Sequence, residues 1–233
     1  MGTGVPALRS IDDWGVAMTE AAQGDQDTAT RLADLRAATG GPGTAAAAWT
    51  WLEELRGAAR EDLRSTEPVL DALFAAGSTP TTLDGATEGI LVATTTNRVL
   101  DTAVKALTSV WMPWRGKRFD LESGSGDNRM TESSSLVGKL LWPLYSMRTD
   151  DDGRSAFDFS TYAEPGVEDP DVDVLVIDYA GIPDNPALVI RSIRDELVEL
   201  VPGVYLGKIF FKMPKLTGDG GFERIGFFAL RTP

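Results

Sequence analysis

Apolar residues change their spacing partway along this chain of 233 residues. In the N-terminal third they recur every three or four positions among many alanines, as at Leu32 and Leu35, which is the period of an amphipathic helix. Glycines and prolines separate these stretches, most clearly at residues 40–43. The pattern predicts helices over residues 12–23, 25–39, 44–64 and 68–76.

Beyond about residue 80 the apolar positions alternate with polar ones and gather in short runs rich in β-branched and aromatic side chains, which is typical of strands. Asp152-Gly153 and Pro202-Gly203 divide neighbouring runs, as the turns of antiparallel hairpins do. Residues 97–110 are helical in period and fit a helix across one end of a barrel. Strands are expected over residues 89–94, 117–121, 140–148, 155–162, 172–179, 191–201, 204–213 and 222–231.

One run, residues 188–200, fits two structures. Its apolar residues Ile190, Ile193 and Leu197 have a spacing that suits a helix, but the short turn into Val204 favours a strand, which we adopt. The sequence therefore predicts an α+β protein in which a helical segment over residues 1–80 precedes an antiparallel β-barrel domain over residues 81–233.

The sequence contains no cysteine and no histidine. The first absence excludes disulfides, thiolate catalysis, iron–sulfur clusters and thiolate-bound zinc. The second removes the side chain that most often serves as a general base or metal ligand near neutral pH. We therefore expect neither a cofactor nor a metal site.

The chain is strongly acidic, because 22 Lys and Arg against 35 Asp and Glu give a net charge of −13. Such a charge repels phosphate backbones and anionic membrane surfaces. The sequence shows no apolar run near the roughly 20 residues that span a bilayer and no secretory pattern at its start. We expect a cytoplasmic protein without nucleic acid or membrane partners, and a homodimer stays open.

Three segments of the β region share features with a known family. Residues 83–89, Leu-Asp-Gly-Ala-Thr-Glu-Gly, keep the order glycine, three residues, glycine, with Thr87 where the family has tryptophan. Residues 113–119, Pro-Trp-Arg-Gly-Lys-Arg-Phe, are similar to its aromatic-x-Gly-Lys-x-Phe signature, and residues 177–231 are similar in order and spacing. The region 83–233 thus resembles the uncharacterised bacterial and fungal GXWXG-type proteins. The resemblance implies a calycin-like, that is lipocalin-like, β-barrel and no particular reaction.

Aromatic and cationic side chains are the candidates for contacting a ligand. Aromatic rings with polar tips suit the wall of an apolar pocket, although they also fill ordinary barrel cores. The three cations around Gly116 can hold a carboxylate, an enolate or a phosphate, but they also suit a solvated strand edge. The candidates are Trp111, Trp114, Arg115, Lys117, Arg118, Trp142, Tyr145, Arg191, Arg194, Tyr205 and Phe210.

Charged residues interrupt the apolar strand expected over residues 191–201. Alternation sends Arg194 and Glu196 to one face of this strand, and Arg191 and Asp195 to the other. On an interior face such groups can form a structural ion pair, or a carboxyl with a raised pKa can act as a base. Tyrosine and lysine side chains nearby can donate to a developing oxyanion. The catalytic candidates are Glu196, Tyr179, Lys208 and Asp195.

Two functions from different classes follow. A barrel with aromatic walls can bind a small hydrophobic molecule, such as a lipid-like, polyketide-like or terpene-like compound. The same pocket can serve a cofactor-independent cyclase or isomerase of natural-product biosynthesis, because such chemistry can depend on orientation and one or two polarising donors. A third hypothesis makes the acidic helices an interaction module and the barrel only a scaffold.

Overall fold

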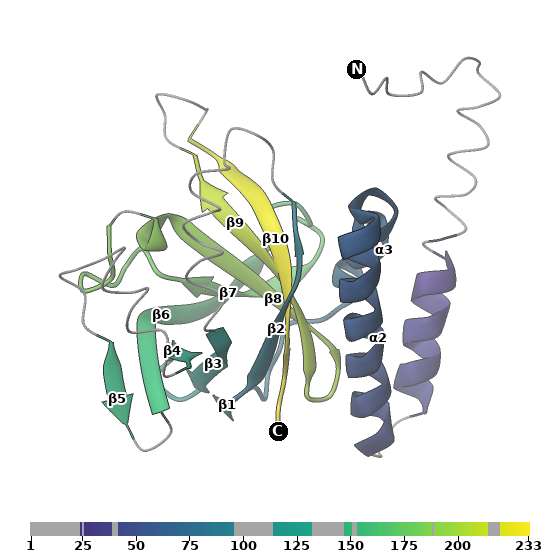
Figure 1. The fold of residues 1–233 in the computed structure, drawn as a ribbon, viewed down its shortest axis with the longest axis horizontal. Coiled ribbons are helices and arrows are strands. Elements are labelled where there is room, and N and C mark those ends of the chain that lie inside the picture. Colours follow the sequence, from purple (N-terminus) through teal and green to yellow (C-terminus); the bar gives the residue numbers. More distant parts are fainter. Residues whose placement is uncertain are drawn as a thin grey trace.

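The computed structural model describes residues 24, 26–38, 42–95, 114–131, 147–150, 153–187, 189–213 and 220–233. It places helices side by side against one flank of a large, strongly curved sheet (Figure 1). The expected helices over residues 12–23 and 97–110, and nearly all of the expected strand over residues 140–148, lie outside the described residues. The candidates Trp111, Trp142 and Tyr145 lie outside them as well.

The helical layer consists of residues 26–37, α2 (Pro42–Glu61) and α3 (Leu63–Ala75). The helix predicted over residues 44–64 ends at Glu61, and the helix predicted from residue 68 begins at Leu63, so both predicted boundaries are wrong. Asp62 separates the two helices, since its carboxylate accepts hydrogen bonds from the backbone N–H groups of Arg64 and Ser65 at the start of α3. No helix among the described residues is long and apolar enough to cross a membrane.

The strands form one antiparallel sheet in the order β1-β3-β4-β6-β7-β8-β9-β10-β2, with β5 paired to β6. Their bounds are β1 (Gly85–Ala86), β2 (Glu88–Thr94), β3 (Trp114–Asp120), β4 (Ser125–Met130), β5 (Arg148–Asp150), β6 (Gly153–Pro165), β7 (Asp173–Asp178), β8 (Ile193–Val201), β9 (Val204–Lys212) and β10 (Phe222–Arg231).

The two ends of this sheet meet in one continuous segment, because β1 pairs with β3 and β2 pairs with β10. Between them, Thr87 donates its backbone N–H to the carbonyl of Lys117 at 2.8 Å, and its hydroxyl accepts the Lys117 N–H at 3.1 Å. Gly116 permits this approach, since a Cβ there would lie 2.2 Å from the Thr87 carbonyl oxygen. The sheet is therefore a nearly closed antiparallel barrel beside N-terminal helices, which confirms the predicted fold class.

Alternation along the strands supplies two hydrophobic cores. One lies inside the barrel and includes Phe159, Leu197 and Phe228. The other lies between the helices and the outer surface of the sheet, where Leu52 and Phe74 pack in the same cluster as Val198. The helices and the barrel thus share a core, while the proposed domain boundary at residue 80 stays a prediction.

The ambiguous run after residue 188 is a strand, as expected, but it begins at Ile193 because residues 190–192 form a 3₁₀ turn. Both faces of β8 are buried, which explains why its sequence lacks a simple apolar and polar alternation. The predicted turn at Pro202-Gly203 joins β8 to β9, with Gly203 at φ +81°. β1 and β4 were not predicted, and the expected strand over residues 140–148 meets β5 only at Arg148. β4, Ser-Gly-Asp-Asn-Arg-Met, has little intrinsic preference for strands.

Candidate functional site

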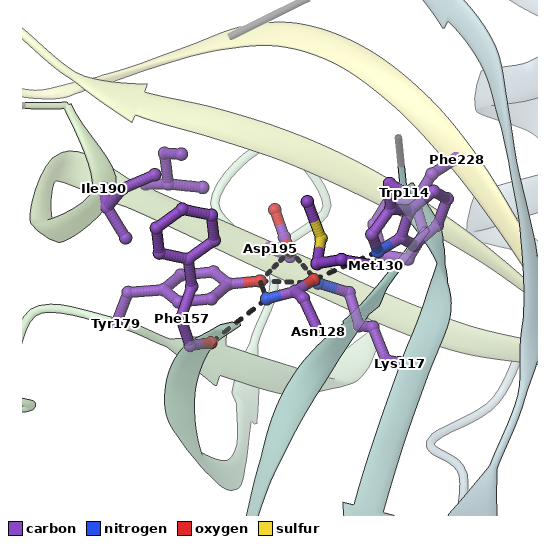
Figure 2. Close-up of a pocket in the computed structure, with 10 residues that line it drawn as sticks. Trp114, Lys117, Asn128, Met130, Phe157, Tyr179, Ile190, Asp195 and Phe228 are labelled. Carbon is purple, nitrogen blue, oxygen red and sulfur yellow. Dashed lines mark hydrogen bonds and ion pairs between the residues drawn. The ribbon is translucent and has the colours of Figure 1, made fainter. Parts of the chain in front are cut away.

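A cavity lies within the barrel, lined among the described residues by both apolar and polar side chains (Figure 2). Its volume is about 20 Å³, which accommodates one water or one small functional group of a ligand. A larger ligand has to displace side chains. The lining residues are Trp114, Lys117, Asn128, Met130, Phe157, Tyr179, Ile190, Ile193, Asp195 and Phe228.

Lys117 is the centre of the polar part of this cavity. It lies on β3 and is 3% exposed. Its ammonium donates to Asp195 Oδ2 at 2.8 Å, to Asn128 Oδ1 at 3.0 Å and to the Tyr179 hydroxyl. Its three protons are therefore all used, and Lys117 and Asp195 form a buried ion pair with no net charge.

Tyr179 and Asn128 complete the cluster. The Tyr179 hydroxyl donates to Asp195 Oδ2 at 3.0 Å and accepts from Asn128 Nδ2 at 3.3 Å (Figure 2). Asn128 Oδ1 also accepts the indole N–H of Trp114 at 3.1 Å. Four side chains from β3, β4, β8 and the end of β7 thus fix one another through hydrogen bonds.

A bulge in β6 shapes the same wall of the cavity. Gly126 and Asn128 on β4 face Phe159 and Ala156 on β6, so β6 carries one extra residue between these pairs. Phe157 lies in this bulge with φ of 55°, and its carbonyl accepts from Asn128 Nδ2 at 3.1 Å. The bulge therefore brings an aromatic side chain to the cavity and orients the amide of Asn128.

Asp195 presents one carboxylate oxygen that has no hydrogen-bond partner among the residues that the structure describes. This atom is Oδ1, and the residue is 1% exposed. In Figure 2 one Asp195 oxygen points away from Lys117 and Tyr179. A buried acceptor left without a donor costs about 1–3 kcal/mol. A donor from a bound molecule at this atom would therefore remove that cost.

Burial controls the ionisation of the two other titratable groups of the cluster. It lowers the pKa of Lys117, although the Asp195 carboxylate acts in the opposite direction. It raises the pKa of Tyr179 well above its usual range, and Asp195 adds to this effect. Near neutral pH Tyr179 is thus a neutral hydroxyl that can donate a hydrogen bond.

Glu196 and Lys208 lie on the opposite face of the sheet from this cavity. Glu196 accepts from Arg194 Nε at 2.8 Å and from the backbone N–H of Val167 at 3.0 Å. Burial raises the pKa of Glu196, and these hydrogen bonds oppose the increase. The prediction that Arg194 and Glu196 lie on one face of this strand and Asp195 on the other is confirmed. Arg191, expected on the Asp195 face of a strand, instead lies in the 3₁₀ turn, so its strand placement is wrong.

Lys208 joins the barrel to the helices. Its ammonium contacts the carboxylates of Asp71 at 2.9 Å and Asp169 at 2.7 Å, and it lies 4.8 Å from the centre of the Phe74 ring. Arg224 forms ion pairs with the same Asp71 and with Glu67. These contacts connect α3, the loop after β6 and the outer surface of β9 and β10.

The other described candidates for ligand contact do not line the cavity. Arg115 is exposed, and Arg118 forms an ion pair with Asp127 at 3.8 Å. Arg191 donates to the backbone carbonyl of Ala180 at 3.2 Å. Phe210 is opposite Arg194 in the β8–β9 register, on the outer face. Of the predicted residues that lie within the described part of the chain, the structure therefore brings together only Trp114, Lys117, Tyr179 and Asp195.

Tyr205 lies in the barrel interior, away from the cavity. Its ionisation lowers the stability of the fold at alkaline pH. Burial raises its pKa to about 12 from an ordinary 10.0, and the Glu199 carboxylate adds to the effect. Since the fold favours the protonated phenol, this contribution is complete below pH 10 and is lost as the pH rises towards 12. We expect the free energy of unfolding of Tyr205→Phe to fall less steeply than that of the wild type across this window. Urea unfolding at several pH values measures both slopes, and equal slopes would contradict the assignment.

Sequence reasoning missed six residues that line the cavity. Asn128 and Met130 lie on β4, which was not predicted, and Phe157 depends on the bulge. Ile190, Ile193 and Phe228 were seen as apolar strand residues, but nothing in an apolar pattern separates a cavity wall from packed core. Asn128 offered the one available signal of a polar site, because it is a polar side chain between Phe119 and Phe159 that a small barrel has to accommodate.

The described residues contain no group of three or more Asp and Glu side chains placed to hold a metal ion. No family model and no curated protein matches this chain. A solved structure, described as a protein from Thermomonospora curvata, is similar over 77% of this chain and 99% of its own, at 13% identity and a TM-score of 0.38. The resemblance to GXWXG-type proteins stays a prediction.

Proposed function

We propose that this protein binds a small, neutral, mainly apolar molecule whose polar end reaches into the barrel cavity. The observation that carries this proposal is the buried Asp195 Oδ1, an acceptor without a donor among the described residues of a mostly apolar cavity. A hydroxyl or N–H group of a ligand would supply that donor.

The charge of the site favours a neutral ligand. Lys117 and Asp195 already neutralise each other at 2.8 Å, so an added carboxylate or ammonium would give the buried region a net charge. Trp114, Phe157 and Phe228 supply apolar contact surface around the polar cluster. The site therefore suits a compound such as an alcohol, a phenol or an enol.

Phenol and toluene test this proposal, because they share a shape and differ in one hydroxyl. We expect phenol to bind about tenfold more tightly than toluene, which corresponds to about 1.4 kcal/mol for a satisfied buried acceptor. Titrations followed by NMR measure both affinities. Equal affinity, or binding of neither compound, would remove the support for the site.

A matched pair of variants locates the effect, since Asp195 and Glu196 are neighbouring carboxylates on opposite faces of β8. In Asp195→Asn the amide oxygen faces the donors Lys117 and Tyr179, and its NH₂ group faces the cavity. This variant should lose the preference for phenol. Glu196→Gln should keep it. A cytoplasmic location and assembly into a homodimer stay predictions.

A further inference from the structure

We propose that Asp195 is a general base that removes a proton from the carbon beside the carbonyl of a neutral ketone or aldehyde, so that the protein interconverts keto and enol forms of its ligand. The proposal rests on the proposed binding function and names the substrate class of the same cavity.

The two oxygens of Asp195 have different roles in this geometry. Oδ2 accepts from Lys117 at 2.8 Å and from Tyr179 at 3.0 Å, so the carboxylate cannot turn freely. Oδ1 is buried and has no partner among the described residues, and Asp195 lines the cavity together with Met130 and Phe157. A base held in this way is preorganised, because no hydrogen bond has to break before Oδ1 accepts a proton.

The proton and the electrons balance without a further reactant. The C–H bond beside the carbonyl breaks, and its proton forms an O–H bond with Asp195 Oδ1. The C–H electron pair forms a carbon–carbon double bond, and the π pair of the carbonyl moves onto oxygen. Negative charge passes from Asp195 to the enolate, so the total charge of the site is unchanged. Transfer of the same proton from Asp195 to the enolate oxygen gives the neutral enol and restores the carboxylate. In a substrate with a neighbouring carbon–carbon double bond, return of the proton to a different carbon shifts that double bond.

Lys117 and Tyr179 are placed to compensate for this movement of charge. When Asp195 becomes neutral, the Lys117 ammonium loses its anionic partner and can donate to the enolate oxygen instead. The ammonium lies 5.2–5.8 Å from the ring centres of Trp114, Phe159, Tyr179 and Phe228. These rings exclude water and tolerate the cation, which keeps its attraction for the enolate strong.

Two other carboxylates near this strand lie on its opposite face and cannot replace Asp195. Glu196 is fully buried on the opposite face and is held by Arg194 and the Val167 N–H. Glu164, also paired with Arg194, lies on that face too. Among the described residues that line the cavity, Asp195 is the only carboxylate.

Exchange of the hydrogens beside the carbonyl of cyclohexanone in D₂O, followed by proton NMR, tests the proposal. We expect the wild type to accelerate exchange at least about 100-fold over an equal concentration of acetate, the range of a positioned base. Asp195→Asn should return the rate to that background. The matched variant Glu196→Gln should exchange as fast as the wild type. Phenol, which resembles the enol, should inhibit competitively.

The outcomes separate this inference from binding itself. A folded Asp195→Asn variant that exchanges as fast as the wild type overturns the role of Asp195. If that variant does not fold, the wild-type exchange rate is the test. A wild-type rate no higher than that of acetate, or a wild-type rate that saturating phenol leaves unchanged, also overturns the role of Asp195. Binding of phenol without exchange overturns enolisation alone. Binding of neither phenol nor cyclohexanone overturns both proposals.

Discussion

Replacing Lys117 with methionine should lower the free energy of unfolding by about 3–5 kcal/mol. The substitution keeps most of the length of the side chain and leaves the Asp195 carboxylate buried, with only the Tyr179 hydroxyl still donating to it. Breaking a buried ion pair on one side is costly because the remaining charge cannot be solvated. Urea unfolding followed by circular dichroism measures the loss.

Two controls show whether the stranded charge is the cause. Lys117→Met combined with Asp195→Leu removes both charges and should recover most of the lost stability, since apolar replacement of a buried pair is often close to neutral. Glu88→Gln breaks the exposed pair with Arg231, which has a distance of 2.6 Å, and should cost no more than about 1 kcal/mol. A double variant as unstable as Lys117→Met would show that packing, not charge, explains the effect.

Replacing Phe74 with alanine should also lower the free energy of unfolding by about 3–5 kcal/mol. Phe74 lies on α3 with no exposed surface, in the core that the helices share with the outer face of the sheet. Its removal leaves a cavity and takes an aromatic face from the Lys208 ammonium. We expect one cooperative unfolding transition at lower urea, seen equally by far-UV and near-UV circular dichroism.

This result bears on the hypothesis that the helices are an accessory interaction module. Arg64→Ala changes an exposed residue of the same helix and should alter the free energy of unfolding by less than about 0.5 kcal/mol. If Phe74→Ala produces two separate transitions, with the sheet unfolding at the wild-type urea concentration, the helices do not stabilise the barrel.

Local pattern was sufficient for most elements of this fold. Seven of the eight expected strands coincide with observed ones over most of their length, because β-branched and aromatic runs between turn residues have few alternatives. Local pattern failed at Asp62, where one side chain ends a helix and starts another, and at β4, where hydrogen bonds to β3 and β6 hold a sequence with weak strand preference.

The candidate site was only partly predictable, for a related reason. Tyr179, Asp195 and Lys117 were candidates because of their chemistry, and so were Glu196 and Lys208, which the structure places on the other side of the sheet. Chemistry alone could not separate the two groups. Asn128, which links Lys117 to Tyr179, belongs to the strand that the sequence did not reveal.

By itself, the sequence determined that helices precede a β region, that a hairpin turns at Gly203 and that Asp195 and Glu196 face opposite ways, because these follow from hydrophobic periodicity, local turn chemistry and the two-residue period of a strand. Only the tertiary structure decided which of those carboxylates faces the cavity. Both faces of β8 are buried, one by the barrel interior and one by the helices and the loop after β6. A pattern of burial alone cannot tell such faces apart. The closure of the sheet at Thr87 and Lys117 fixes the inside of the barrel, and with it the position of Asp195.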